Sequence, residues 1–422
     1  MLTVINKINF QKTYHYLLLL FAFTLPLSRA LNSISIALLL LLLLLQGNYK
    51  VQFARLKESP FAMSILAFIS YTILSLLWTQ NLKTGLNGQL LYLYWLAIFA
   101  IALNVKKEDI HLIIKAFILG MVVSEILSYG MFFGIWEING HGKEYPSPFM
   151  MHIDYSIFLA FTAIVLLNRL LSNRYTKKEK AAILFFFLTI CGNLFINEGR
   201  TGQVALAFGI FAVAFIHFKL TLKSFFLSVL LLATILLVSF NFIDKFHTRV
   251  LDAKTDIIKI DEGKFTDSLG QRVAMYIVAA DIVEENPFIG VGVGDYKDAA
   301  AAALEKNTHG FSKSVVDFIP KNHFHSQYLN VLVQGGIIGL ALLLWLFYQF
   351  AKLPIEDPEL KELSILAIVV LLAGFLPEPL LLKQFTNNLF ILFAGLFLGA
   401  SLQEKPTPSN KQSRQKRSST LN

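Results

Sequence analysis

Two arginines are the residues best suited to bind an anion in this sequence. Arg200 stands in "NEGRTGQ" between two apolar runs, and Arg272 opens a helical pattern after "SLG". A guanidinium is always charged and binds phosphate oxygens through paired hydrogen bonds, so two facing arginines could hold a pyrophosphate. Gly199 and Gly202 would let a bulky anion approach the backbone at the start of the next helix. The alternative is an interfacial Arg200 paired with Glu198 or lipid headgroups, and an ordinary solvated Arg272.

Two histidines form the second candidate group. His323 and His325 lie in "NHFHSQYLNVLVQGG", where a long hydrophilic segment meets the next apolar run. A neutral imidazole in this position could take a proton from a sugar hydroxyl. The pair could also bind a metal if extended, but only two or three candidate ligands lie nearby, so we predict no metal. Hydrogen-bonded interfacial histidines without a chemical role remain the alternative.

Other polar residues are weaker candidates. His152 and Asp154, at the mouth of an apolar run, could contact an acceptor, whereas Lys115 and Glu125 fall inside a run and have no assigned role. The sequence "GVGVG" follows a Pro-Phe pair, lacks the dinucleotide-binding spacing, and is interpreted as a structural turn. The single cysteine excludes a disulfide within the chain.

The composition identifies the elements that must position these residues. Of 422 residues, 55% are hydrophobic and only 15% are charged, and apolar runs long enough to cross a bilayer recur throughout. Such runs must be helices, because lipid offers the backbone no hydrogen-bond partners. We predict an all-α polytopic membrane protein with about twelve transmembrane helices. Their expected positions are 14–28, 31–46, 60–79, 89–104, 111–135, 153–171, 181–197, 202–218, 224–243, 327–350, 361–377 and 384–402.

Basic residues indicate the orientation. If the N-terminus is cytoplasmic, every cytoplasmic connection is rich in Lys and Arg, while each short loop on the other side holds one. Those single residues are Arg29, Lys83, Lys143, Arg200 and Lys383. Because the net charge of +9 follows this pattern, it indicates topology rather than nucleic-acid binding. Both termini are therefore expected in the cytoplasm.

The same reasoning divides the chain into four regions. Residues 1–243 hold transmembrane helices 1–9, residues 244–326 form a large loop outside the cytoplasm, residues 327–402 hold helices 10–12, and residues 403–422 are a disordered basic tail. Within the loop, "QRVAMYIVAADIVEENP" has apolar residues at helical spacing and ends at a proline. A small Ala-rich helix is expected at 298–305.

With these motifs in order, the chain resembles the O-antigen ligase and polymerase superfamily of bacterial inner-membrane glycosyltransferases. The resemblance covers most of the chain and includes "FAFTLPLS", the Gly-Arg-x-Gly connection, "R…NPFIGVGVGDY", and "H-S-Q-Y-L" before a Gly-rich span. The family usually has His-Asn-x-x-Leu at the last motif, so Ser326 departs from it, His325 aligns with it, and His323 is an additional histidine.

The resemblance implies a metal-independent, inverting transferase of the glycosyltransferase-C type that needs no cofactor. Its donor would be a glycan on undecaprenyl pyrophosphate at the periplasmic face, and its acceptor a sugar hydroxyl of lipid A–core. Arg200 and Arg272 would bind the pyrophosphate, His325 would orient or deprotonate the acceptor, and His323 is a further candidate substrate ligand. Family likeness around "NEGRTGQ" and "HFHSQYL" favours a ligase over an O-antigen polymerase. A protein O-oligosaccharyltransferase is a weaker alternative, because such enzymes often carry a larger C-terminal extracytoplasmic region than the short basic tail expected here. A transporter or lipid flippase would need repeated halves and paired midplane charges, which the sequence lacks.

Overall fold

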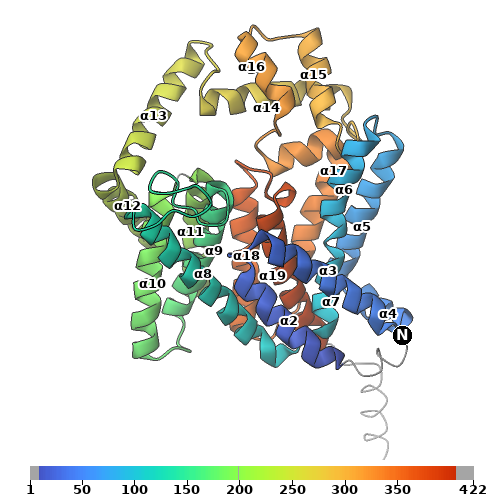
Figure 1. The fold of residues 1–422 in the computed structure, drawn as a ribbon, viewed down its shortest axis with the longest axis vertical. Coiled ribbons are helices and arrows are strands. Elements are labelled where there is room, and N and C mark those ends of the chain that lie inside the picture. Colours follow the sequence, from blue (N-terminus) through green and yellow to red (C-terminus); the bar gives the residue numbers. More distant parts are fainter. Residues whose placement is uncertain (1–8, 198, 405–422) are drawn as a thin grey trace, which may run out of the picture.

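The structure is a computed structural model that describes residues 9–197 and 199–404, and it shows a helical bundle with a helical layer over one end (Figure 1). Apart from an isolated bridge between Ile138 and His141, the described residues form helices, turns and loops. The predicted all-helical class is confirmed. The bundle helices are α2 (Phe10–Thr24), α3 (Arg29–Gln46), α4 (Tyr49–Lys57), α5 (Pro60–Leu74), α6 (Leu82–Leu93), α7 (Leu96–Asn104), α8 (Ile110–Phe132), α9 (His152–Leu171), α10 (Lys177–Ile196), α11 (Arg200–Phe218), α12 (Leu222–Phe242), α17 (Gln327–Ala351), α18 (Pro358–Gly374) and α19 (Gln384–Glu404).

Ten helical stretches among the described residues are long and apolar enough to cross a membrane, so the chain is a multi-pass membrane protein. Twelve spans were predicted, and the other two coincide with α2 and α18, of 15 and 17 residues. At a rise of about 1.5 Å per residue, each is shorter than a hydrocarbon core of about 30 Å. The twelve-span count and the orientation stay predictions. The predicted tail lies outside the described residues, except for Gln403 and Glu404, which end α19.

Local sequence determines where several bundle helices begin. Ser28 and Ser59 cap α3 and α5 through their side-chain oxygens, and Pro60 then occupies the first turn of α5. Thr176 and Glu179 form a reciprocal capping box at the start of α10. These caps satisfy amide groups that the helix itself cannot pair. They explain why helix starts agree with the apolar pattern to within a few residues.

The interior helices of the bundle are α9 and α19, whereas α12 is the most exposed span. Aromatic rings join the interior helices, with the ring centroids of Phe117 and Phe393 5.3 Å apart and those of Phe161 and Phe393 4.6 Å apart. Both pairs meet edge to face, the arrangement that the ring quadrupole favours. The helices α8, α9 and α19 are therefore packed tightly together, and this packing positions the residues at their ends.

The layer over one end, which we term the cap layer, consists of α13 (Asp244–Asp261), α14 (Ser268–Glu285), α15 (Tyr296–Lys306) and α16 (Lys313–Phe318) (Figure 1). Helices were predicted where α14 and α15 lie, but α13 and α16 were not predicted. The layer has its own apolar core from α14, α15 and residues 311–333, which include α16 and the first two turns of α17. The buried members are Ala274, Met275, Val278, Ala279, Ile282, Ala300, Leu304, Phe311, Val315, Ile319, Phe324 and Val333.

The loop between α14 and α15 is fastened to a break in α17. At Gly336 the backbone has φ 59° and ψ −165°, a conformation that only glycine adopts readily. The carbonyl groups freed by this break accept hydrogen bonds from the loop, Val291 N to Val333 O at 2.9 Å and Gly292 N to Gln334 O at 3.0 Å. In the other direction, Ile337 N donates to Pro287 O at 2.9 Å. These bonds support the interpretation of "GVGVG" as a structural turn.

Candidate functional site

Glu378 is the centre of a charged cluster at the end of the bundle that the cap layer covers. Its carboxylate Oε1 accepts hydrogen bonds from His325 Nδ1 at 2.8 Å and Arg272 Nη2 at 3.2 Å. Lys383 Nζ lies 3.5 Å from the other oxygen, Oε2. The Glu378 side chain is fully buried, whereas its three partners are partly exposed. The cluster therefore joins two of the predicted site residues through a carboxylate that was not predicted.

The start of α17 holds His325 in place. Ser326 caps α17, since its Oγ accepts from Leu329 N. Gln327 binds the chain on both sides of Glu378. Its N–H donates to Phe375 O at 2.9 Å, and its Oε1 accepts from Leu381 N at 2.9 Å. The imidazole and carboxylate are thus fixed by backbone on both sides.

The cap layer supplies Arg272 from the second turn of α14. The same helix carries Tyr276, whose hydroxyl donates to the carbonyl of His325 at 3.2 Å. Two contacts from one helix face therefore tie the cap layer to the bundle at this cluster.

The protonation states follow from burial and from these partners. Burial alone would raise the pKa of Glu378, but the His325 hydrogen bond and the charge of Lys383 lower that pKa to about 2. Burial lowers the pKa of His323 to about 4, and the neighbouring His325 adds to this effect. The rings of the two histidines meet edge to face with centroids 4.6 Å apart. At neutral pH, Glu378 is therefore a carboxylate and His323 a neutral imidazole.

One potential metal-ligand set coincides with this cluster. Ligand atoms of His323, His325 and Glu378 lie within 4.8 Å of one another. A divalent cation there would meet the fixed positive charges of Arg272 and Lys383, which already neutralise the only carboxylate of the set. The arrangement fits a hydrogen-bonded histidine better than a metal site, and the absence of a metal requirement stays a prediction.

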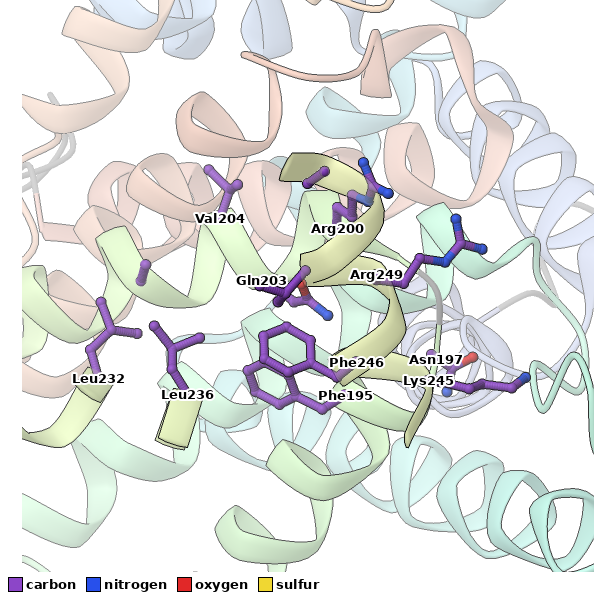
Figure 2. Close-up of a pocket in the computed structure, with 13 residues that line it drawn as sticks. Phe195, Asn197, Arg200, Gln203, Val204, Leu232, Leu236, Lys245, Phe246 and Arg249 are labelled. Atoms are coloured by element: carbon purple, nitrogen blue, oxygen red, sulfur yellow. The ribbon is translucent and has the colours of Figure 1, made fainter. Parts of the chain in front are cut away.

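Arg200 lines a neighbouring cavity of about 380 Å³ between α10, α11, α12 and α13 (Figure 2). Its cationic residues are Arg200, Lys245 and Arg249, and its apolar wall includes Leu232 and Leu236 of α12. In Figure 2 the cationic side chains lie at one side and the leucines at the other. The charges of Arg249 and Arg272 both act on the Arg200 guanidinium, so the cavity lies within electrostatic reach of the Glu378 cluster.

The glycines beside Arg200 have a different role from the predicted one. A Cβ at Gly202 would lie 2.1 Å from Ser156 O, and one at Gly199 would lie 2.3 Å from Ser156 Cβ. The amide of Gly202 also donates to Ser156 Oγ at 3.0 Å. The expectation that both glycines admit an anion is therefore wrong, because α9 occupies that space. The proposed partner Glu198 lies outside the described residues.

Asp154, one of the weaker candidates, lies beside the Glu378 cluster. The charges of Lys383, Glu378 and Arg29 all act on its buried carboxyl group, and its Oδ1 has no hydrogen-bond partner among the described residues. The role of Asp154 and His152 as acceptor contacts stays a prediction. Glu125 is also buried, in α8.

Four charged residues of the cluster and the cavity were not singled out in the sequence as site residues: Glu378, Lys383, Lys245 and Arg249. An acid between two prolines in "PEP", directly after an apolar run, was an available signal for Glu378. Lys383 served only as a topology marker. Lys245 and Arg249 belong to α13, a helix that was not predicted, so nothing indicated which way they would face.

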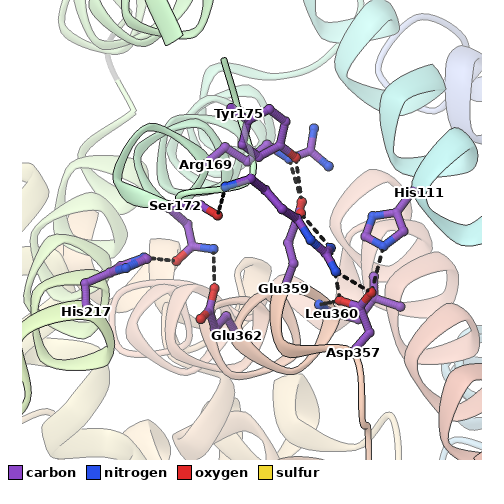
Figure 3. Close-up of polar contacts among 11 residues, drawn as sticks. His111, Arg169, Ser172, Tyr175, His217, Asp357, Glu359, Leu360 and Glu362 are labelled. Atoms are coloured by element: carbon purple, nitrogen blue, oxygen red, sulfur yellow. Dashed lines mark hydrogen bonds and ion pairs between the residues drawn. The ribbon is translucent and has the colours of Figure 1, made fainter. Parts of the chain in front are cut away.

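A second charged network lies around the start of α18 and was not predicted (Figure 3). Arg169 Nε donates to Glu359 Oε1 at 2.9 Å, and both side chains are about 95% buried. Arg174 contacts Glu359 and Asp357 at 3.1 and 3.0 Å, and His111 Nε2 lies 3.2 Å from Asp357. These residues join α8, α9 and α18, so their role includes packing as well as topology.

Comparison with known proteins gives a family for part of the chain. Residues 184–344 match a protein-family model described as O-Antigen ligase. The match contains Arg200, Arg272, His323 and His325, together with the whole cap layer, whereas Glu378 lies beyond it. No curated protein matches the chain. The matched segment, from α10 to α17, therefore belongs to the O-antigen ligase family, whose members are ligase- and polymerase-type enzymes of the membrane.

Proposed function

We propose that the protein is an O-antigen ligase of the bacterial inner membrane. It transfers a glycan from undecaprenyl pyrophosphate to a sugar hydroxyl of lipid A–core at the periplasmic face. The observation that carries this proposal is the Arg200 cavity, in which three cations adjoin an apolar wall. A polyprenyl pyrophosphate has the matching structure, a dianionic head on a hydrocarbon chain.

The cavity suits the head of such a donor. Guanidinium groups bind phosphate oxygens with paired hydrogen bonds, and Arg200 and Arg249 bring two of them to one cavity. Leu232 and Leu236 belong to α12, the most exposed span, so the prenyl chain can continue directly from the head into lipid. Neither a nucleotide nor a metal is needed for activation, because the bond to the pyrophosphate is already activated.

The Glu378 cluster suits the acceptor. Because the carboxylate accepts from His325 Nδ1, Nε2 is the basic nitrogen of the ring. The acceptor hydroxyl gives its proton to Nε2 as its oxygen attacks the anomeric carbon. The bond from that carbon to the phosphate oxygen breaks, and the pyrophosphate leaves as an anion. Arg200 and Arg272 stabilise the charge that develops on it.

The test is a lipopolysaccharide gel of a deletion strain. Loss of a ligase leaves lipid A–core without O-antigen while lipid-linked polymer accumulates, whereas loss of a polymerase, which uses the same donor, leaves core with a single repeat. Wild-type protein should restore the ladder, and Arg200→Ala or His325→Ala should not. Lys83→Ala, at an exposed position of α6, is the matched control and should restore it. A normal ladder with both site variants, at wild-type protein levels, would refute the mechanism.

A further inference from the structure

A second cavity of about 400 Å³ lies under the other end of α14 and plays no part in the mechanism above. The C-terminal end of α14, the helix α15 and the turn between α5 and α6 surround it. The residues with polar or aromatic groups on it include Trp78, Gln80, Glu285, Asn286, Asp298 and Lys306.

Hydrogen bonds between distant segments hold this cavity open. The carboxylate of Asp295 accepts from Gln80 N at 2.6 Å and from Asn81 N at 3.0 Å, which joins the α5–α6 turn to the start of α15. Asn81 Nδ2 also donates to Asp298 Oδ2 at 3.2 Å. The cavity floor includes Gly290 and Val291 of the loop that is bonded to the break in α17. The walls are thus set by backbone that cannot shift independently.

The lining has the chemistry of a carbohydrate site. An indole offers an apolar surface to sugar C–H groups, and carboxylates and amides bind sugar hydroxyls as acceptors and donors. The ring of Trp78 contacts that of Tyr71, with centroids 6.3 Å apart, and the buried Nε1 of Trp78 has no hydrogen-bond partner among the described residues. Asp298 uses only one carboxylate oxygen in the Asn81 contact.

The charges exclude the other substrates of the proposed reaction. Three carboxylates line the cavity, and its single cation, Lys306, is already paired with Glu285 at 2.7 Å. This arrangement repels a pyrophosphate, and the polar wall does not suit an acyl chain. A neutral, hydroxyl-rich ligand is the class that remains.

The position of the cavity relates it to the transfer site. Arg272 and Glu285 are on the same helix, thirteen positions apart, which corresponds to about 20 Å along α14 at 1.5 Å per residue. A glycan held at the Glu378 cluster could extend along α14 to this cavity. We propose that the Trp78 cavity binds neutral sugar residues several units away from the transferred bond. The proposal rests on the function proposed above and assigns it a remote glycan subsite.

The test uses the purified full chain in lipid nanodiscs, with free oligosaccharides as probes. One arm uses O-antigen repeats released from lipid, and the other uses core oligosaccharide released from the deletion strain. Each probe should quench tryptophan fluorescence if it binds, and Trp78→Phe should abolish that change while Trp136→Phe should not. The arm that responds identifies the source of the glycan. No binding in either arm would overturn the subsite even if transfer is normal.

Kinetics test the same site during transfer. Asp298→Ala and Trp78→Ala should raise the KM of the responding substrate about tenfold when its glycan is long, and leave the KM for a one-repeat donor or truncated core unchanged. Equal effects on long and short substrates would refute a remote subsite. If no donor supports transfer but the free oligosaccharide still binds through Trp78, the proposed function fails and the subsite stands.

Discussion

Replacing Glu378 with glutamine should disable the transfer reaction while leaving the fold intact. The carboxylate binds the imidazole through Nδ1 at 2.8 Å, and this contact selects the tautomer whose Nε2 is basic. A glutamine side chain can accept one hydrogen bond in the same place, but it carries no charge to stabilise the imidazolium that forms. A carboxylate-to-amide change beside a catalytic histidine in a serine protease lowers kcat about 10⁴-fold, and we expect a loss between about 10² and 10⁴ here.

The same substitution also has a cost in stability. Removing one partner of a buried ion pair typically costs about 3–5 kcal/mol, because the remaining charges are left uncompensated. Arg272, His325 and Lys383 are 22%, 21% and 14% exposed, so water relieves part of this cost, and a value near the lower end, about 3 kcal/mol, is expected.

Steady-state transfer by the purified protein in nanodiscs separates the two effects, when it is measured well below the melting temperature of every variant. Lys383→Met is the control, because it removes an ion-pair partner of Glu378 Oε2 and leaves the bond from His325 to Oε1. Its kcat should stay near that of the wild type. In a His325→Ala background, Glu378→Gln should change kcat little, since both residues act through one group. A Glu378→Gln protein whose kcat stays within about tenfold of wild type would refute the role of the carboxylate.

Three further changes have definite expected outcomes. Arg249→Ala should raise the donor KM about tenfold with little change in kcat, whereas Lys254→Ala on the same helix should not, as initial rates with purified donor would show. Burial holds the pKa of His323 near 4, so the folded state resists protonation while the unfolded chain protonates below about 6.5. The free energy of unfolding should therefore fall by about 2–3 kcal/mol as pH falls from about 6.5 to about 4, and melting temperatures should fall with it. His323→Asn should abolish this pH dependence. Gly336→Ala should destabilise the protein by more than about 1–3 kcal/mol, because a Cβ would come within 2.2 Å of the Phe288 backbone. Gly339→Ala is the control and should cost less, because its Cβ would meet Tyr71 at 3.2 Å. Equal melting temperatures for the two variants would argue against the break in α17.

Short-range sequence information determined the class of the protein and much of its architecture. The length of an apolar run can be read from consecutive residues alone. The helices from α8 to α12 therefore lie within a few residues of their predicted positions. The same holds for caps, such as Thr176 with Glu179. Arg200 and His325 could be selected because each adjoins an apolar run, and Arg272 because it opens the helical pattern of the large loop. The motifs of all three also resemble one family.

Tertiary structure decided how those residues are combined. Arg272 and Glu378 are 106 residues apart in the chain, and His325 and Glu378 are 53 apart, so no local pattern links them. The break at Gly336 depends on donors from a loop more than forty residues earlier, and the three-cation cavity depends on the direction in which α13 turns. An ion pair or a broken helix is stable only when its partner is present, and the partner is supplied by the fold. That is why the residues of the site were largely visible in the sequence, while the carboxylate that organises them was not.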